Sequence, residues 1–450
     1  ETWGAGDLAE PPEIDLGLVS AIPTQKISDD ILEIIKKADS MEETLSESEV
    51  VRLMQARGAD YSAVCQTADR LRKRLAGEEV TYCVNRNINY TNVCYFKCQF
   101  CAFSKGKMSE NLRGRPYDLT HEEIMRRAKE AWDRGASEVC LQGGIHPEYD
   151  GKTYIDICRS IKQVVPNMHI HAFSPLEVWQ GAKTLGVSIS EFLGELKAAG
   201  LDTLPGTAAE ILDDEVRKTL CPDKINTAQW LEVMECAHEA GFNTTATIMY
   251  GHMEQYSHVA RHLLRIKALQ SRTQGFTEFV ILPFIHMESP LYLKGKARKG
   301  PTFREAVLIH AVSRLVLAPE FRNIQASWTK LGHQGVLACL RAGVNDVGGT
   351  LMNETITRAA GASHGQETTP EEMEKIIERA GRIPRQRSTT YGPVSDTQRQ
   401  KSFGAMGLSD PVYSSAKKYE RKTKKKKTEL VRPGLDNLEG EDRISSADII

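Results

Sequence analysis

The sequence predicts an α/β protein whose main domain is a TIM-type (βα)8 barrel, with an N-terminal helical preface and a disordered basic C-terminal tail. The first observation is that short apolar runs, typical of strands, alternate eight times with helical patterns between residues 84 and 385. The second is size, because eight βα units over roughly 300 residues match a barrel somewhat larger than usual. The third is that no GxGxxG motif follows the first strand, which weighs against the alternative, an open doubly wound sheet.

Composition limits the classes of protein to consider. The chain has 450 residues and a formal net charge of −2 at pH 7, which allows one large domain or two ordinary ones and gives no indication of a nucleic-acid partner. No apolar run in the sequence is long enough to cross a membrane. Ten cysteines in a long chain of ordinary composition indicate a reducing compartment, so we expect a cytoplasmic protein, with an organelle left open.

The N-terminal part is expected to lie outside the barrel. Residues 1–45 read as an acidic linker, and a chain that starts with Glu1 rather than Met has the character of a fragment or a processed product. Residues 46–83 are expected to form the helical preface, which starts with a capping box from Ser46 to Glu49.

The barrel itself is assigned to residues 84–385. Strands are expected at Asn87–Tyr90, Glu138–Leu141, His169–Phe173, Asp202–Leu204, Thr245–Tyr250, Glu278–Pro283, Ile324–Ser327 and Asp346–Gly349. Helices are expected at Glu122–Arg134, Ile155–Val164, Ser190–Ala199, Ala228–Ala240, Val259–Ser271, Phe303–Leu317, Gly335–Arg341 and Pro370–Arg379. Since a barrel carries its chemistry on the loops after the strands, those loops hold the candidate site residues.

The C-terminal residues 386–450 are expected to be a disordered tail that can be removed without loss of folding. Their apolar content is low, and Lys417–Lys427 holds eight basic residues in eleven. A nuclear or nucleic-acid role for this basic run is the alternative to a solvated one.

One loop after the first expected strand carries the strongest chemical signal. Cys94, Cys98 and Cys101 are spaced so that three thiolates can converge on one corner of an iron–sulfur cluster. A [4Fe–4S] cluster usually takes four thiolates, so three with no obvious fourth would leave one iron for a ligand that is not protein. That arrangement is typical of a catalytic site. The alternative is a zinc knot, but zinc requires four nitrogen or sulfur ligands and no further pair lies nearby.

This loop resembles the signature of the radical SAM enzymes, in which S-adenosylmethionine (SAM) occupies the open iron. The aromatic residue just before the last cysteine, Phe100, belongs to the resemblance. The flanks, residues 85–93 and 102–104, resemble the branch that builds FO, the deazaflavin chromophore of coenzyme F420, and in close cousins menaquinone by the futalosine route. The resemblance runs from Ser46 to Arg385 and is strongest to the tyrosine-using half of FO synthase.

The resemblance implies a transferase reaction. The cluster would cleave SAM, consumed as a cosubstrate, and the resulting radical would abstract hydrogen from L-tyrosine. The Cα–Cβ bond of tyrosine would break, and the 4-hydroxybenzyl fragment would join C5 of 5-amino-6-(D-ribitylamino)uracil. Implied partners are a low-potential electron donor and the other FO synthase half, which is fused upstream in some organisms. The alternatives are a menaquinone-route enzyme acting on a futalosine, and a non-catalytic iron–sulfur or zinc protein.

Candidate site residues follow from the resemblance and from the strand ends. Those expected at SAM are Phe100, Gly143, Gly144, Glu210, Ile248 and Tyr250. The segment after the glycines departs from the common family pattern, because Ile145 stands where an acidic residue is usual. Purely structural roles are the alternatives to SAM binding: the glycines could form an ordinary turn, and Glu210 could be a helix cap.

The substrate pocket is expected to be built from several loops that meet over one mouth. His169 and His171 alternate along one strand and therefore share a face, although a buried structural histidine is the commoner case. Trp328 could stack on a flat ring or could simply be core. The full set expected near the substrate is His146, His169, His171, His286, Glu288, Trp328, Asn345 and Asp346.

Overall fold

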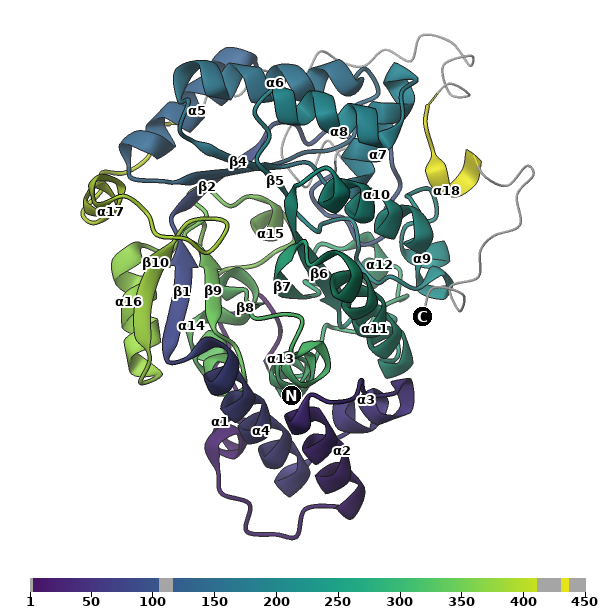
Figure 1. Ribbon diagram of the computed structural model, residues 1–450, viewed down its shortest axis with the longest axis vertical. Coiled ribbons are helices and arrows are strands. Elements are labelled where there is room, and N and C mark those ends of the chain that lie inside the picture. Colours follow the sequence, from purple (N-terminus) through teal and green to yellow (C-terminus); the bar gives the residue numbers. More distant parts are fainter. Residues whose placement is uncertain (1–2, 105–115, 411–429, 437–450) are drawn as a thin grey trace.

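The computed structural model describes residues 3–104, 116–410 and 430–436, and Figure 1 shows them as a curled sheet with helices around it. The basic run at Lys417–Lys427 lies outside the described residues. Within the described ranges, no helix is both long and apolar enough to span a membrane.

The strands of the described chain pair in parallel in a single ten-stranded sheet of order β10-β1-β9-β8-β7-β6-β5-β4-β3-β2. All eight expected strands are confirmed, as β2 to β9, whereas β1 and β10 were not predicted. The bounds are β1 Glu79–Cys83, β2 Asn85–Asn89, β3 Glu138–Gln142, β4 His169–Ala172, β5 Thr203–Leu204, β6 Asn243–Tyr250, β7 Phe276–Pro283, β8 Ile324–Ala326, β9 Asp346–Gly349 and β10 Ile383–Arg387.

The two ends of the strand series meet along one continuous stretch of chain. Only Val84 separates β1 from β2, yet β1 pairs with β9 while β2 pairs with β3. The backbone N–H of Thr350, just past β9, also donates to the Cys83 carbonyl oxygen (2.9 Å). Residues 79–89 therefore link the last strand to the first, and the sheet takes the TIM-type form that the alternating pattern predicted.

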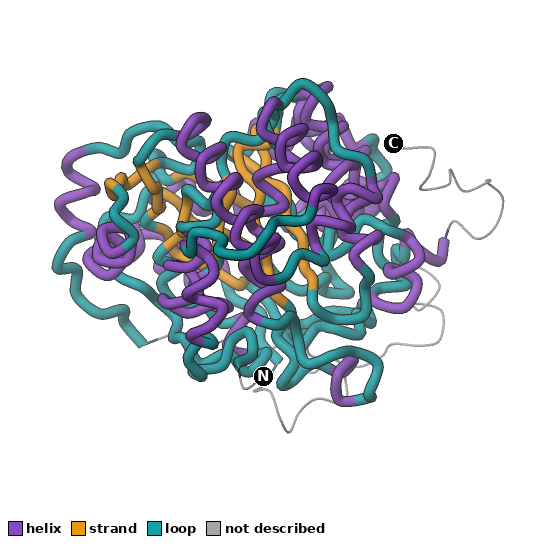
Figure 2. Tube along the Cα trace, turned by 90° about the horizontal axis from the view of Figure 1, so that it is seen from below, coloured by secondary structure: helices purple, strands orange, loops and turns teal. Residues whose placement is uncertain are grey.

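Helices cover the outside of this sheet, and Figure 2 shows the strands enclosed by them. All eight expected helices are confirmed with shifted ends; α7, α9, α12, α15, α17 and α18 are additional. Their bounds are α5 His121–Asp133, α6 Gly151–Val164, α7 Pro175–Leu185, α8 Ile189–Ala198, α9 Asp214–Leu220, α10 Thr227–Glu239, α11 Tyr256–Thr273, α12 Pro290–Leu293, α13 Phe303–Leu317, α14 Trp328–Leu340, α15 Ile356–Ala359, α16 Pro370–Arg379, α17 Asp396–Ser402 and α18 Pro433–Asp436.

The first 45 residues are not the open linker that their composition predicted. They contain two helices, and Ile31 and Ile34 pack into the core. Trp3 is buried as well and meets the ring of Phe303 edge to face, with centroids 5.2 Å apart. The N-terminal helices are α1 Glu13–Ser20, α2 Asp29–Ser40, α3 Glu47–Met54 and α4 Gly58–Ala76; α3 and α4 form the expected preface, and they pack on α11 and α13.

Strand alternation gives the barrel an apolar outer layer and a polar interior. On β3, Val139 and Leu141 are fully buried beneath the helices, whereas Gln142 faces inward and keeps some accessible surface. The barrel interior, as the term is used below, is lined by the inward residues of β2 to β8: Asn85, Asn87, Asn89, Glu138, Cys140, Gln142, His169, His171, Thr203, Thr245, Thr247, Met249, Glu278, Val280, Leu282 and Gln325.

The amino end of the barrel is closed by a segment that follows β10. Arg387 forms a two-pronged ion pair with Asp346 (2.6 and 3.1 Å) and a single contact with Glu278 (3.2 Å). The Thr389 hydroxyl donates to Glu138 (2.6 Å), and the Tyr391 hydroxyl donates to Glu278. Burial raises the pKa of Glu278 to about 7, against the opposing effect of Arg387. We call residues 387–391 the floor segment.

The floor segment corrects the expected start of the tail after Arg385. β10 continues to Arg387, and α17 is held on α5 by the Gln398 side chain, whose amide donates to the carbonyl oxygens of Trp132 (3.1 Å) and Ala136 (2.9 Å). The prediction was wrong because it took polar composition as a sign of disorder. These polar side chains are ordered by hydrogen bonds and ion pairs with buried polar groups of the barrel, and not by an apolar core.

Candidate active site

The cysteine loop that follows β2 is held by loops at the carboxyl ends of three other strands. Its Tyr95 N–H donates to the Ile145 carbonyl oxygen after β3 (3.1 Å). Around Gln99, the N–H donates to the Leu220 carbonyl oxygen (2.9 Å), and the carbonyl oxygen accepts from the Leu291 N–H (2.7 Å). The loop is therefore fixed over the barrel mouth, where the fold places catalytic groups.

The three cysteines fit a cluster better than a single metal ion. All three are reduced and half-buried. Among the described residues, the group whose ligand atoms all lie within 4.8 Å of one another is Asp213, Glu215 and His258, not the three cysteines. The three sulfur atoms are therefore farther apart than ligands of a single zinc ion would be. Burial raises the pKa of the Cys94 thiol to about 11, against a smaller opposing effect of a backbone hydrogen bond at Ile145, so this donor needs a bound cation to be a thiolate near pH 7.

The glycine pair after β3 lies directly against the chain that leads into the cysteine loop. A Cβ on Gly143 would stand 2.3 Å from the Tyr90 ring, and one on Gly144 would stand 2.2 Å from the Val93 carbonyl oxygen. The Gly144 N–H also donates to the Thr91 carbonyl oxygen (2.8 Å). Close packing therefore requires glycine at both positions, and their expected contact with SAM stays a prediction.

Glu210 meets a buried cation that the sequence reasoning missed. The Lys224 ammonium lies 3.0 Å from the Glu210 carboxylate and 5.2 Å from the centre of the Phe100 ring. Glu210 has a left-handed backbone (φ 46°) and is not at a helix N-cap. A charged pair thus flanks the cysteine loop, next to Phe100. Lys224 lies in a loop after a short helix, and only its position in the fold identifies it.

On β6 the expected orientation is reversed. Ile248 and Tyr250 were expected at SAM, but both are fully buried toward the helices, on the same face as Thr244, whose hydroxyl meets His238 of α10 (2.7 Å). Met249, between them, is on the inward face and keeps accessible surface. The apolar run on this strand does not reveal which face is inward, because both faces are buried.

Four of the expected substrate residues lie on loops at the carboxyl ends of strands. His146 stacks on Tyr149, with ring centres 4.9 Å apart, and burial lowers its pKa. His286 and Glu288 are on the loop after β7, and the imidazole of His286 meets the ring of Tyr292 (4.6 Å). Trp328 is almost fully buried, with its indole N–H donating to the Gly349 carbonyl oxygen (2.8 Å); this contact gives it a structural role between β8 and β9.

The other four lie at or toward the amino end, and for Asn345 and Asp346 this is a correction. Asn345 precedes β9 and accepts from Arg314 (2.8 Å), while Asp346 is bound by the floor segment. His169 and His171 do share a face, since both imidazoles contact the Thr203 hydroxyl (2.8 and 2.7 Å).

Burial lowers the pKa of His171 to about 4, so its side chain is neutral near pH 7. Asn345 and Asp346 were assigned to the mouth because they are polar and near a strand, although the strand expected at Asp346–Gly349 begins with Asp346 and so places both residues at the amino end.

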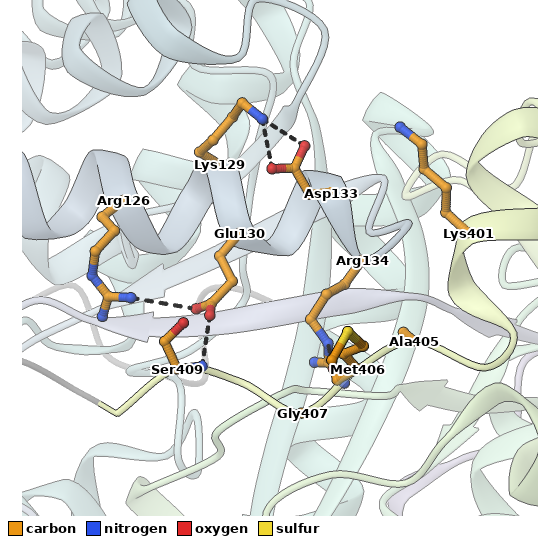
Figure 3. Close-up of a pocket in the computed structure, with 10 residues that line it drawn as sticks. All are labelled: Arg126, Lys129, Glu130, Asp133, Arg134, Lys401, Ala405, Met406, Gly407 and Ser409. Carbon is orange, nitrogen blue, oxygen red and sulfur yellow. Dashed lines mark hydrogen bonds and ion pairs between the residues drawn. The ribbon is translucent and has the colours of Figure 1, made fainter.

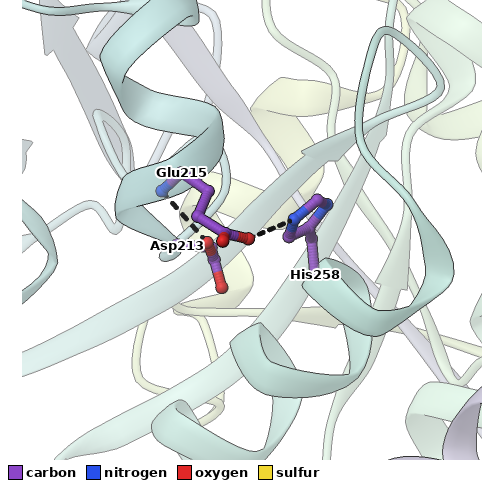
Figure 4. A group of neighbouring side chains, drawn as sticks. All are labelled: Asp213, Glu215 and His258. Carbon is purple, nitrogen blue, oxygen red and sulfur yellow. Dashed lines mark hydrogen bonds and ion pairs between the residues drawn. The ribbon is translucent and has the colours of Figure 1, made fainter. Parts of the chain in front are cut away.

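Two surface features are accounted for by packing. Asp213, Glu215 and His258 converge (Figure 4), but Arg261 pairs with both carboxylates, at 2.7 and 3.6 Å, so no cation is needed there. A groove between α5 and the segment after α17 (Figure 3) is lined largely by charges already paired, such as Lys129 with Asp133.

A short C-terminal segment, residues 430–436, lies on the cysteine loop. The Tyr95 hydroxyl donates to the Val431 carbonyl oxygen (2.6 Å), and the Arg432 guanidinium stands 5.9 Å from the centre of the Tyr95 ring. Part of the region expected to be a dispensable tail therefore contacts the site.

Comparisons with known proteins agree with this geometry. Residues 88–266 match the family model of the radical SAM superfamily, and residues 273–400 match the CofH/MqnC C-terminal region. The chain is 46% identical over 400 residues to the FO synthase of Streptomyces coelicolor, covering 89% of this chain and 45% of that protein. It is 47% identical over 367 residues to the FO synthase of Mycobacterium tuberculosis, covering 82% and 42%. The chain thus spans about half the length of these FO synthases.

One relative is matched over nearly its whole length. The 5-amino-6-(D-ribitylamino)uracil–L-tyrosine 4-hydroxyphenyl transferase of Methanothermobacter thermautotrophicus is 44% identical over 363 residues, which cover 81% of this chain and 97% of that protein. Solved structures agree on the fold: methylornithine synthase is 18% identical with a TM-score of 0.60, over 82% of this chain and 99% of that one. HydG, a maturase of the [FeFe]-hydrogenase, is 16% identical with a TM-score of 0.59, over 83% and 79%. The chain belongs to the radical SAM superfamily, in the family that contains FO synthase and the tyrosine 4-hydroxyphenyl transferases.

Proposed function

We propose that the chain transfers the 4-hydroxybenzyl group of L-tyrosine to 5-amino-6-(D-ribitylamino)uracil in FO biosynthesis. The observation that carries the proposal is the three-cysteine loop, fixed at the mouth of a polar barrel interior in a chain that matches such a transferase over almost its full length. The menaquinone-route alternative has less support, because the relatives of high identity are named for FO chemistry.

Each group near the mouth has a role in this proposal. Cys94, Cys98 and Cys101 would hold a [4Fe–4S] cluster, which would supply the electron for the reductive cleavage of SAM that starts the radical chemistry. The Glu210–Lys224 pair presents one charge of each sign beside Phe100, which suits the amino and carboxylate groups of SAM.

The barrel interior would hold the two substrates. Its inward amides, such as Asn87, Gln142 and Gln325, offer donors and acceptors to the edge of a uracil. The surrounding helices exclude water, and the strands hold the reacting groups in a fixed orientation. Tyrosine would lose one hydrogen atom to the 5′-deoxyadenosyl radical, and its Cα–Cβ bond would then break to leave a glycine-derived imine. The 4-hydroxybenzyl fragment would join C5 of the uracil, and the adduct would return one electron to the cluster and lose one proton.

Two partners and a location belong to the same proposal. A low-potential donor would deliver the electron, and the other FO synthase half would close the deazaflavin ring; the match to half of a longer FO synthase is consistent with a fused or separate second half. A cluster on oxidisable thiolates suits a reducing compartment, such as the cytoplasm.

The test is an anaerobic incubation of reconstituted protein with SAM, tyrosine, the diaminouracil and a reductant, followed by mass spectrometry. We expect a 4-hydroxybenzyl adduct of the diaminouracil and 5′-deoxyadenosine. Cys98→Ala should lose cluster iron and product, whereas Cys236→Ala, a change at a cysteine distant from the loop in sequence, should lose neither. Conversion of a futalosine with no reaction of tyrosine would overturn the proposal in favour of the menaquinone route.

A further inference from the structure

Lys330 carries a charge that no direct ion pair meets. It stands near the start of α14, at the carboxyl end of β8, and its ammonium donates to the Thr357 hydroxyl of α15 (2.9 Å). Among the described residues no carboxylate forms an ion pair with it. The charge of Glu354 acts on Lys330 from a distance and opposes the lowering of its pKa, but both Glu354 carboxylate oxygens accept from the Thr357 N–H (2.9 and 3.1 Å).

Several other enclosed cations of this chain have a carboxylate partner. Arg387 is paired with Asp346, Lys224 with Glu210, and Lys267 is bound by the carbonyl oxygens of Val316 and Ala318 as well as by Glu320. Lys330 is half-buried, and its one hydrogen-bond partner is a neutral hydroxyl; the desolvation of such a cation is not offset by a direct ion pair. In agreement, burial lowers the pKa of Lys330.

Lys330 belongs to a different part of the mouth from the loops that hold the cysteine loop. The cysteine loop is held by loops after β3, β5 and β7, whereas Lys330 and Thr357 belong to the segments after β8 and β9. Two residues before Thr357, the Thr355 hydroxyl accepts from Asn89, the last inward residue of β2 (2.6 Å). Lys330 is therefore next to the barrel interior and apart from the charged pair at Phe100.

The backbone around this wall has features of a functional site. Leu351, Met352 and Asn353, in the loop after β9, all have positive φ (67°, 21° and 73°), an uncommon conformation for residues other than glycine. From the outer side, the Gly6 N–H donates to the Lys330 carbonyl oxygen (2.7 Å). Lys330 is thus held through its side chain by α15, which follows the loop with positive φ values, and through its backbone by the N-terminal segment.

We infer that Lys330, with Thr357, is the binding site for the carboxylate of the amino-acid substrate. A carboxylate would supply the missing counter-charge and accept from both the ammonium and the hydroxyl. The assignment of this carboxylate to tyrosine rests on the proposed function; the site itself requires only a small carboxylic acid at the mouth.

The experiment compares three ligands on reconstituted protein with SAM bound: L-tyrosine, 3-(4-hydroxyphenyl)propanoate, which keeps the carboxylate, and tyramine, which lacks it. Dissociation constants are measured anaerobically by calorimetry for the wild type, Lys330→Met, Lys330→Arg and the control Lys375→Met, an exposed lysine on α16. We expect the wild type and the control to bind both carboxylates about tenfold or more tightly than tyramine. Lys330→Met should lose that difference and leave tyramine binding unchanged, and Lys330→Arg should keep most of it.

Each other outcome decides against the inference or separates it from the proposed function. Equal binding of all three ligands by the wild type overturns the inference, as does a Lys330→Met protein that still prefers the carboxylates. If Lys330→Met does not fold, Thr357→Val takes its place and should weaken binding of the two carboxylates but not of tyramine. A wild type that prefers carboxylates but forms no adduct supports the site and contradicts the proposed transfer. A Lys330→Met protein that forms product with unchanged tyrosine affinity supports the transfer and contradicts the site.

Discussion

At the scale of single residues, the site depends on glycines that allow close packing as much as on the cysteines that would bind the cluster. Gly143 and Gly144 have no room for a Cβ because the chain leading into the cysteine loop lies against them. Beneath them, the Tyr90 hydroxyl donates to the buried Glu177. The position of the cysteines therefore depends on the packing of these residues, which are not expected cluster ligands.

Gly144→Ala tests this dependence. The new methyl group would stand 2.2 Å from the Val93 carbonyl oxygen, so the glycine loop or the cysteine loop must shift. We expect cluster iron content to fall by more than half while the circular dichroism spectrum is kept, since the strain is confined to two loops.

The matched control for that change is Gly194→Ala on α8, where nothing lies within 4 Å of the new Cβ. It should keep full iron content and raise helix stability by up to about 1 kcal/mol. Equal iron content in both variants would contradict the proposed dependence of the cluster on this packing.

At the scale of elements, the two unpredicted strands do most to complete the barrel. β1 joins the first and last strands of the series, and β10 lies outside it and carries Arg387 into the amino end. β10 has few apolar residues because its Arg387 binds buried carboxylates. The sequence pattern therefore does not reveal this strand, and its role follows only from the position of those carboxylates in the fold.

Truncation separates this floor from the tail. A chain ending at Arg385 loses Arg387, Thr389 and Tyr391 and leaves Asp346 and Glu278 buried without a cation, at a cost of roughly 3–5 kcal/mol. We expect this chain to be insoluble or to melt at a much lower temperature. A chain ending at Asp410 should keep its melting temperature within a few degrees. Similar thermal melts for the two truncations would show that the floor segment does not stabilise the barrel.

At the scale of the whole molecule, stability depends on ionisable groups that folding removes from water. Glu177, which accepts from Tyr90 beneath the glycine pair, is one of them: burial raises its pKa to about 6, above the value near 4.3 expected in an unfolded chain. The folded state then holds more protons than the unfolded state between these two values. Its contribution to stability is present at low pH and is lost as the pH rises through about 6.

Glu177→Gln removes that dependence. Relative to wild type, the variant should gain about 2 kcal/mol of unfolding free energy between pH 4.5 and pH 7.5, as measured by denaturant unfolding at both values. Glu195→Gln, a change at an exposed residue of α8, is the control and should show no such gain. A pH-independent difference between the wild type and Glu177→Gln would contradict the assignment.

The sequence by itself determined the eight-fold alternation, the cysteine loop and the glycine pair. These features are local: a strand period, a spacing of three thiols and the absence of a side chain are all read along the chain. The resemblance to a family added the chemistry of that loop. The expected strands and helices all lie where the structure has them, because each segment's own pattern agrees with its place in the fold.

Only the tertiary structure decided which polar residues work together. It placed Asp346 at the floor rather than the mouth and turned Met249, not Ile248, inward. It also brought Lys224 to Glu210 and left Lys330 without a counter-charge. The physical reason is that the end of a strand on which a residue lies, the face it occupies and the charge that meets it depend on contacts between segments far apart in sequence. A local pattern carries no record of those contacts.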